Sequence, residues 1–177
     1  MILGISGTNS SGKDTVAKHI QDNGYFHESL SEILREEMKK QNIKINRDNM
    51  IIFSNKFGQK YGADVLAKIA YKQFGNKKKL IISSIRKQAE LDFLHSLPNF
   101  KLIFVDVSVE IRYDRMIKRA REGENVLSFE DFKILQEKEM NGTNSQNLSY
   151  CKGKADYQID NSGSLGDLFT KIDDIVR

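Results

Sequence analysis

Short apolar segments alternate along this chain with longer segments in which apolar residues recur every three or four positions. The short segments predict five strands, at residues 2–6, 25–28, 80–82, 102–106 and 156–160. The longer segments predict helices at residues 13–22, 31–40, 47–57, 62–74, 87–97, 108–121, 129–140 and 164–176. Continuous apolar strands that alternate with helices are typical of a parallel sheet covered on both faces. The pattern therefore predicts an α/β three-layer sandwich, with a parallel five-stranded sheet and helices on both faces.

The size and composition of the chain narrow its class. It has 177 residues, which favours a single domain with a substantial core. We predict one domain over residues 1–177, with residues 141–149 forming a polar loop. The run at residues 2–5 leads directly into a glycine-bounded loop, so we interpret it as a strand and not as a signal peptide. With no apolar run of about 20 residues, we expect a cytoplasmic protein without membrane contact.

The net charge and the cysteine content of the chain argue against several classes of protein. The net charge is only +4, and the basic residues are dispersed among acids without interleaved aromatic residues. We therefore expect no nucleic-acid partner. The single cysteine, Cys151, excludes an internal disulfide and a cysteine-rich zinc site, including that of a zinc deaminase. We interpret Cys151 as an ordinary packed thiol.

A phosphate-binding loop follows the first predicted strand and precedes the first predicted helix. Its backbone N–H groups and the start of the helix would bind phosphate oxygens, and Lys13 would reach the outer phosphates. Glycines at both ends permit backbone angles and close approaches that a side chain blocks. The candidate nucleotide ligands are Gly7, Thr8, Asn9, Ser10, Ser11, Gly12, Lys13, Asp14 and Thr15.

Asp14 departs from the usual pattern of this loop, which places Ser or Thr directly after the lysine. A carboxylate beside triphosphate oxygens would be repelled, so Asp14 either turns away from the phosphates or acts through the metal ion. The first alternative is our prediction, and it makes Thr15 the hydroxyl donor to phosphate. We consequently assign no protein side chain as a metal ligand.

The loop and several arginines downstream resemble the small-molecule kinases of the P-loop fold, the nucleoside monophosphate kinase group. The match covers nearly the whole chain and implies ATP and Mg²⁺ as cofactors, an acceptor lobe at about residues 30–75 and a lid at about residues 112–145. Segment 30–35 matches the helix that carries an acceptor-phosphate arginine, and segment 83–86 matches the turn that carries a second one. The resemblance thus implies Ser31, Arg35, Ser84 and Arg86 as acceptor-binding residues, and Arg86, Arg119 and Arg121 as catalytic residues beside Lys13.

Planar arginines suit this chemistry because they pair bidentately with phosphate oxygens. Phosphoryl transfer depends mainly on positioning and charge stabilisation. The family's metal-polarising acid at the end of the third strand is Ser84 here, and Asp106 either replaces it or caps its own strand. From position alone, Asn55, Gln59 and Tyr61 are expected near the base or sugar of a nucleotide acceptor.

Within this group three subfamilies compete. The loop and the Ser84–Arg86 turn resemble phage-type deoxynucleoside monophosphate kinases and the kinase-like domain of some deoxycytidylate deaminases. Residues 155–164 resemble dephospho-CoA kinases, which implies that Asn161 and Gly163 lie near the adenine of ATP. We rank a (deoxy)nucleoside monophosphate kinase first, dephospho-CoA kinase second and phosphomevalonate kinase third. A non-catalytic nucleotide-binding module stays open as another class, and the oligomeric state, monomer or homodimer, also stays open.

Overall fold

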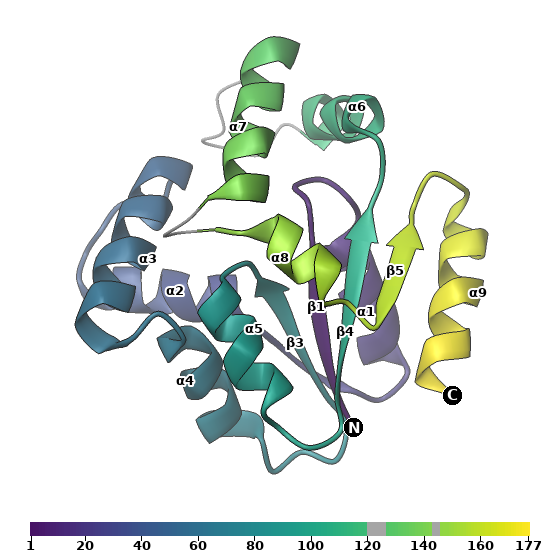
Figure 1. The fold of residues 1–177 in the computed structure, drawn as a ribbon, viewed down its shortest axis with the longest axis horizontal. Coiled ribbons are helices and arrows are strands. Elements are labelled where there is room, and N and C mark those ends of the chain that lie inside the picture. The colour runs from purple at the N-terminus through teal and green to yellow at the C-terminus, as the bar shows by residue number, and fades with distance from the viewer. Residues whose placement is uncertain (120–126, 143–145) are drawn as a thin grey trace.

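A five-stranded parallel sheet forms the centre of the molecule (Figure 1). The structure, a computed structural model, describes residues 1–119, 127–142 and 146–177. The strands are β1 (Ile2–Gly7), β2 (Phe26–Ser29), β3 (Leu80–Ile85), β4 (Phe100–Asp106) and β5 (Tyr157–Asp160). They lie in the order β2-β3-β1-β4-β5, and all four pairings are parallel. The predicted fold class is confirmed.

Helices cover both faces of the sheet. They are α1 (Lys13–Asp22), α2 (Leu30–Lys40), α3 (Arg47–Tyr61), α4 (Val65–Phe74), α5 (Gln88–His95), α6 (Val109–Arg119), α7 (Phe129–Asn141), α8 (Leu148–Gly153) and α9 (Leu165–Val176). Polar side chains cap several of them: Asn46, Ser128, Asn147 and Ser164 each accept a hydrogen bond from a backbone N–H in the first turn that follows. The prediction of a loop through residue 149 was wrong, because α8 begins at Leu148. None of the helices in the described parts of the chain combines the length and the apolar character that a membrane crossing requires.

The core consists of two clusters, one on each face of the sheet. Along β3, Leu80 and Ile82 belong to the cluster under α2, α4, α5 and α8, whereas Ile81 belongs to the cluster under α1 and α9. Alternate residues of a strand face opposite sides, so a strand covered on both faces is apolar throughout. This arrangement leaves the carboxyl ends of the strands as the polar edge of the sheet.

A β-bulge lies at this edge, between β1 and β3. Ile5 pairs with Ser83 and Ser6 pairs with Ile85, so Ser84 is an extra residue without a partner in β1. Ser84 has a φ of 64°, in the left-handed region. Bulges of this kind occur beside active sites, where they redirect a side chain.

Candidate functional site

The predicted phosphate loop lies at the end of β1, and its backbone has the special geometry that such a loop needs. Gly12 has a φ of 98° and directly precedes α1. A Cβ atom at Gly7 would lie 2.2 Å from the carbonyl oxygen of Val105, so only glycine fits there. The loop thus packs directly on β4 and leads into the N-terminus of a helix, which is a site for phosphate.

Lys13 is buried in the ligand-free molecule, with 7% of its surface exposed. Its Nζ lies 3.4 Å from the carbonyl oxygen of Thr8, to which it donates a weak hydrogen bond. Burial, and then the nearby charge of Arg86, lowers the pKa of Lys13 from its usual 10.5 to about 8. The lysine is therefore a desolvated cation that gains an anionic partner when a nucleotide binds.

Asp106 anchors the loop to the end of β4. Its carboxylate accepts hydrogen bonds from the hydroxyl of Thr8 (2.8 Å), the N–H of Val107 (2.9 Å) and Nζ of Lys152 (2.9 Å). Burial raises the pKa of this carboxyl, but the hydrogen bonds from Lys152, Thr8 and Val107 outweigh it and hold the pKa below its usual value. With both oxygens engaged, Asp106 acts as a strand-end anchor, one of the two roles that its position predicts.

The loop after β5 also contacts the phosphate loop. The Asn161 amide donates to the carbonyl oxygen of Ser11 at 2.7 Å, and Arg115 donates to the Asn161 carbonyl at 3.0 Å. Arg115 is also 3.4 Å from the Ser11 carbonyl, so it joins α6 to both loops. Gly163 lies beside Asp167 at the start of α9. Of the two predicted adenine neighbours, Asn161 therefore forms a hydrogen bond with the phosphate loop, and Gly163 does not.

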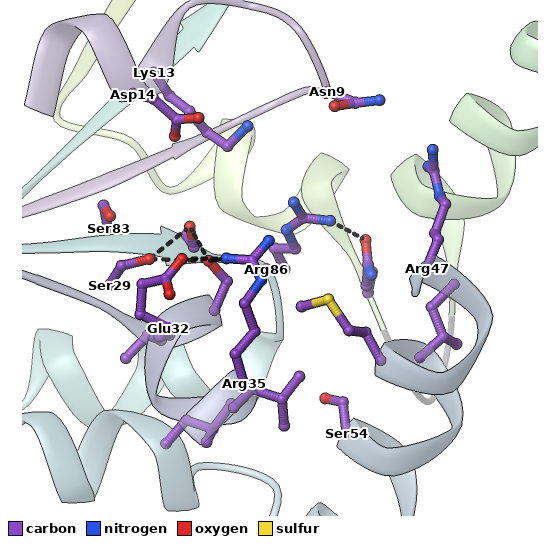
Figure 2. A pocket seen from close by; sticks show the side chains of 18 of the residues that line it. Asn9, Lys13, Asp14, Ser29, Glu32, Arg35, Arg47, Ser54, Ser83 and Arg86 are labelled. Carbon is purple, nitrogen blue, oxygen red and sulfur yellow. Dashed lines mark hydrogen bonds and ion pairs between the residues drawn. The ribbon is translucent and has the colours of Figure 1, made fainter. Parts of the chain in front are cut away.

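A cavity of about 630 Å³, here called the strand-end pocket, opens beside Lys13 (Figure 2). Eight of the predicted site residues line it: Asn9, Lys13, Asp14, Ser31, Arg35, Ser84, Arg86 and Arg119. Arg35 comes from α2 and Arg86 from the end of β3, and the sheet brings both to the same edge as the phosphate loop. Arg121 lies outside the described residues. The pocket therefore unites residues that are more than a hundred positions apart in the sequence.

The pocket lining differs in two places from the residues that the sequence singles out. Asp14 lines the strand-end pocket next to Lys13, with its carboxylate directed into it, whereas Thr15 is exposed outside it (Figure 2). Asn55, Gln59 and Tyr61 are also absent from the lining that the described residues form. Ser54, one position earlier on α3, lies there instead, since successive helical residues point about 100° apart.

Serine hydroxyls form the floor of the pocket. Ser29, Ser31 and Ser84 are mutually hydrogen-bonded, at 3.0 to 3.3 Å, and the Ser83 hydroxyl lies 2.8 Å from Nε2 of His27. The left-handed backbone at Ser84 brings its side chain to this cluster. The predicted substrate residues Ser31 and Ser84 are thus in direct contact.

Arg86 is held from several sides. Its backbone N–H donates to Glu90, a buried carboxylate. Burial raises the pKa of Glu90 above its usual value, and the hydrogen bonds from Arg86 and Lys87 offset only part of this rise. Nη1 of Arg86 lies 3.3 Å from the Gln146 side chain and 3.9 Å from Glu139. Glu139 also forms an ion pair with Arg47, the first residue of α3. Sequence reasoning assigned no role to Arg47 or Glu139, because neither belongs to a local motif.

Magnesium fits the donor set of this pocket. Mg²⁺ in phosphotransferases is bound by one or two carboxylates, by substrate phosphates and by waters. Asp14 supplies a carboxylate beside the phosphate loop. No group of three or more His, Cys, Asp or Glu side chains arranged for a metal occurs within the described ranges. Asp14 is therefore the residue that would contact the ion, with the nucleotide phosphates supplying further oxygens.

Sequence comparison agrees with this arrangement. Residues 3–133, which include the phosphate loop, Arg35, Arg86 and α6, match the family model described as AAA domain. The chain belongs to this AAA domain family. It is also 25% identical to the UPF0200 protein of Sulfurisphaera tokodaii, over 99% of this chain and 96% of that protein. The UPF0200 protein of Methanoregula boonei has the same identity and coverage.

Solved structures of similar fold include kinases. The structure of TT1252 from Thermus thermophilus has a TM-score of 0.69, with 18% identity over 99% of this chain and 96% of that one. Shikimate kinase from Acinetobacter baumannii, solved with shikimate, has a TM-score of 0.63, with 16% identity over 99% and 92% of the two chains. At these identities the likeness shows the fold alone, an α/β fold that this chain shares with these structures.

Proposed function

We propose that this protein is an ATP-dependent phosphotransferase whose acceptor is a (deoxy)nucleoside monophosphate. The observation that carries the proposal is the convergence of Lys13, Arg35, Arg47 and Arg86 on one pocket beside the phosphate loop. A protein that only binds nucleotide needs the loop and the lysine. It has no need for three further arginines beyond the terminal phosphate, whereas a phosphate acceptor does.

The other half of the pocket suits a nucleoside. Leu34, Ile45, Met50, Ile51 and Leu66 form an apolar wall on the α2–α4 side. Small-molecule sites combine such apolar walls with a few polar groups that orient the ligand. The arginines would bind the acceptor phosphate, and the apolar wall would contact the base. The acceptor phosphate is already anionic, so its transfer step needs no general base.

Each residue has a defined task in this reaction. Lys13 and the loop N–H groups hold the outer phosphates of ATP, and Arg35 and Arg86 orient the acceptor oxygen in line with the terminal phosphorus. Arg119, at the end of α6, lines the same pocket and would neutralise charge on the transferring group. Bound magnesium would neutralise further charge on the phosphate oxygens.

The test is a screen of ATP consumption with Mg²⁺ against ribo- and deoxyribonucleoside monophosphates and dephospho-CoA. Turnover that rises with one monophosphate supports the proposal and names the acceptor. A response to dephospho-CoA alone would replace it with the second-ranked kinase. ATP binding without any acceptor response would favour a non-catalytic module.

Arg86→Ala separates catalysis from nucleotide binding. Loss of one charge-assisted contact with phosphate is worth about 1.5–3 kcal/mol, so kcat/KM for the acceptor should fall about 10- to 150-fold. The affinity for ATP should stay within about twofold, since Arg86 lies on the acceptor side. An equal loss of ATP affinity would place Arg86 in the nucleotide site and contradict this assignment. Lys56→Ala, an exposed change on α3, is the control.

A further inference from the structure

Glu139 is a buried carboxylate in the strand-end pocket. Its side chain, on α7, is 6% exposed and lines the pocket together with Arg47 and Arg86. Oε1 pairs with Arg47 and lies 3.9 Å from Arg86. Oε2 is buried and has no hydrogen-bond partner among the described residues. A buried carboxylate with one oxygen unsatisfied is costly, so the folded chain retains it against an energetic penalty.

The neighbours of Glu139 are cations that come from three elements. Arg47 begins α3 and Arg86 follows β3, while Lys13 begins α1 and also senses the charge of Glu139. Lys13 and Arg86 both line the pocket (Figure 2). The negative charge of Glu139 therefore lies where the proposed reaction places anionic phosphate oxygens. A second anion cannot join it there without strong repulsion.

Two other carboxylates of the pocket, Glu32 and Glu90, have different surroundings. Glu32 pairs with Arg35, but its side chain is 57% exposed, so this pair is weak. Glu90 is occupied by the N–H groups of Arg86 and Lys87 at the start of α5. Glu139, by contrast with these two, contacts two arginines that come from different elements.

We infer that Glu139 substitutes for the acceptor phosphate in the empty pocket, and that Arg47 and Arg86 exchange this carboxylate for the phosphate when the acceptor binds. Arg47 is then a third arginine of the acceptor site, beside Arg35 and Arg86. This inference rests on the proposed function for its substrate. It adds Arg47 as a phosphate ligand that the sequence motifs do not contain, and Glu139 as a carboxylate that the acceptor must displace.

The exchange of Glu139 for the acceptor also makes the pocket selective for the net charge of the acceptor. A phosphomonoester carries close to two negative charges at pH 7, because its second pKa is near 6. It can therefore replace one carboxylate and still gain attraction from the arginines. A carboxylate acceptor brings only the charge that Glu139 already supplies. The pocket thus favours dianionic acceptors over monoanionic ones.

The experiment measures binding of inorganic phosphate by calorimetry, with the phosphate loop filled by Mg²⁺ and the non-hydrolysable ATP analogue AMP-PNP. Glu139→Gln keeps the side-chain shape and removes the competing charge, so phosphate should bind about tenfold more tightly than to wild type. Arg47→Ala should weaken binding about tenfold. Glu137→Gln, an exposed change on the same helix, and Lys56→Ala on α3 serve as matched controls and should bind like wild type. Thermal denaturation of each variant verifies folding.

The direction of the Glu139→Gln effect decides the matter. Weaker phosphate binding, in a folded variant, would mean that Glu139 supports the site and would overturn the inference. Unchanged binding in both Glu139→Gln and Arg47→Ala would overturn it as well. The proposed function fails separately, when no monophosphate is turned over although phosphate binding shifts as expected. If a monophosphate is turned over and its KM is unchanged in both Glu139→Gln and Arg47→Ala, the exchange is refuted and the proposed function stands.

Discussion

Lys13 gives the sharpest test of the physical reasoning, because the structure predicts that removing it stabilises the ligand-free protein. A lowering of the Lys13 pKa from 10.5 to about 8 corresponds to about 3 kcal/mol, which is the cost of burying its charge and of placing it near Arg86. Lys13→Met keeps the packed stem and removes the charge. The free energy of unfolding at pH 7, measured by urea denaturation, should rise by up to about 3 kcal/mol, or roughly 6–12 °C in Tm.

The pH dependence of this gain has a defined sign. Below pH 8 Lys13 is charged in both the folded and unfolded states, so the folded protein carries the full cost. Between pH 8 and 10.5 the folded protein releases the proton while the unfolded chain keeps it, and wild type recovers stability. The difference between Lys13→Met and wild type should therefore shrink over this range.

Two comparisons complete the test of Lys13. Lys18→Met on the same helix removes an exposed pair with Asp22 and should change stability by no more than about 1 kcal/mol. Mg²⁺ and ATP should raise the Tm of wild type but hardly that of Lys13→Met, because the loop loses its cation. If ligand-free Lys13→Met proved less stable than wild type at pH 7 while Lys18→Met remained neutral, the desolvation argument would be refuted.

Two further predictions concern the surroundings of the loop. Asp106→Asn should lower the free energy of unfolding by about 1–3 kcal/mol at pH 7. This loss should fade as the pH falls through the depressed pKa of Asp106. Identical urea denaturation curves for the variant and wild type at pH 7 would contradict the anchoring role of Asp106. Burial raises the pKa of the Cys151 thiol to about 12. We therefore expect the thiol reagent DTNB at pH 8 to label Cys151 only after the protein unfolds. Rapid stoichiometric labelling of the native protein would contradict this and show that the thiol is accessible.

The parts of the fold that depend on local patterns were predictable from the sequence. Five short segments predicted the five strands, and the phosphate loop, Arg35 and Arg86 lie at the predicted edge of the sheet. Parallel topology brings the carboxyl ends of strands together, so motifs that follow different strands must meet. The missed helix α8 is short, and only Leu148 and Cys151 on it are buried, too few to give a periodic signal.

The parts that depend on tertiary packing were not predictable. In α7, charged residues occur at many positions, and the sequence does not distinguish the buried Glu139 from the exposed Glu137. Arg47 likewise resembles any basic residue near a helix start. For Asp14, the repulsion between isolated charges does not say which way the side chain lies, whereas the helix geometry directs its carboxylate into the pocket.

The bulge at Ser84 has a consequence for how the pocket and the core can vary. Ile85 belongs to the same core cluster as Ile82, three positions earlier, whereas regular alternation would place it on the opposite face. The apolar pattern of β3 is therefore complete without Ser84, which is an insertion that the sheet tolerates. The chemistry of the pocket floor at this position is thus uncoupled from the packing of the sheet, and a different side chain there would change what the pocket recognises without opening a cavity beneath it.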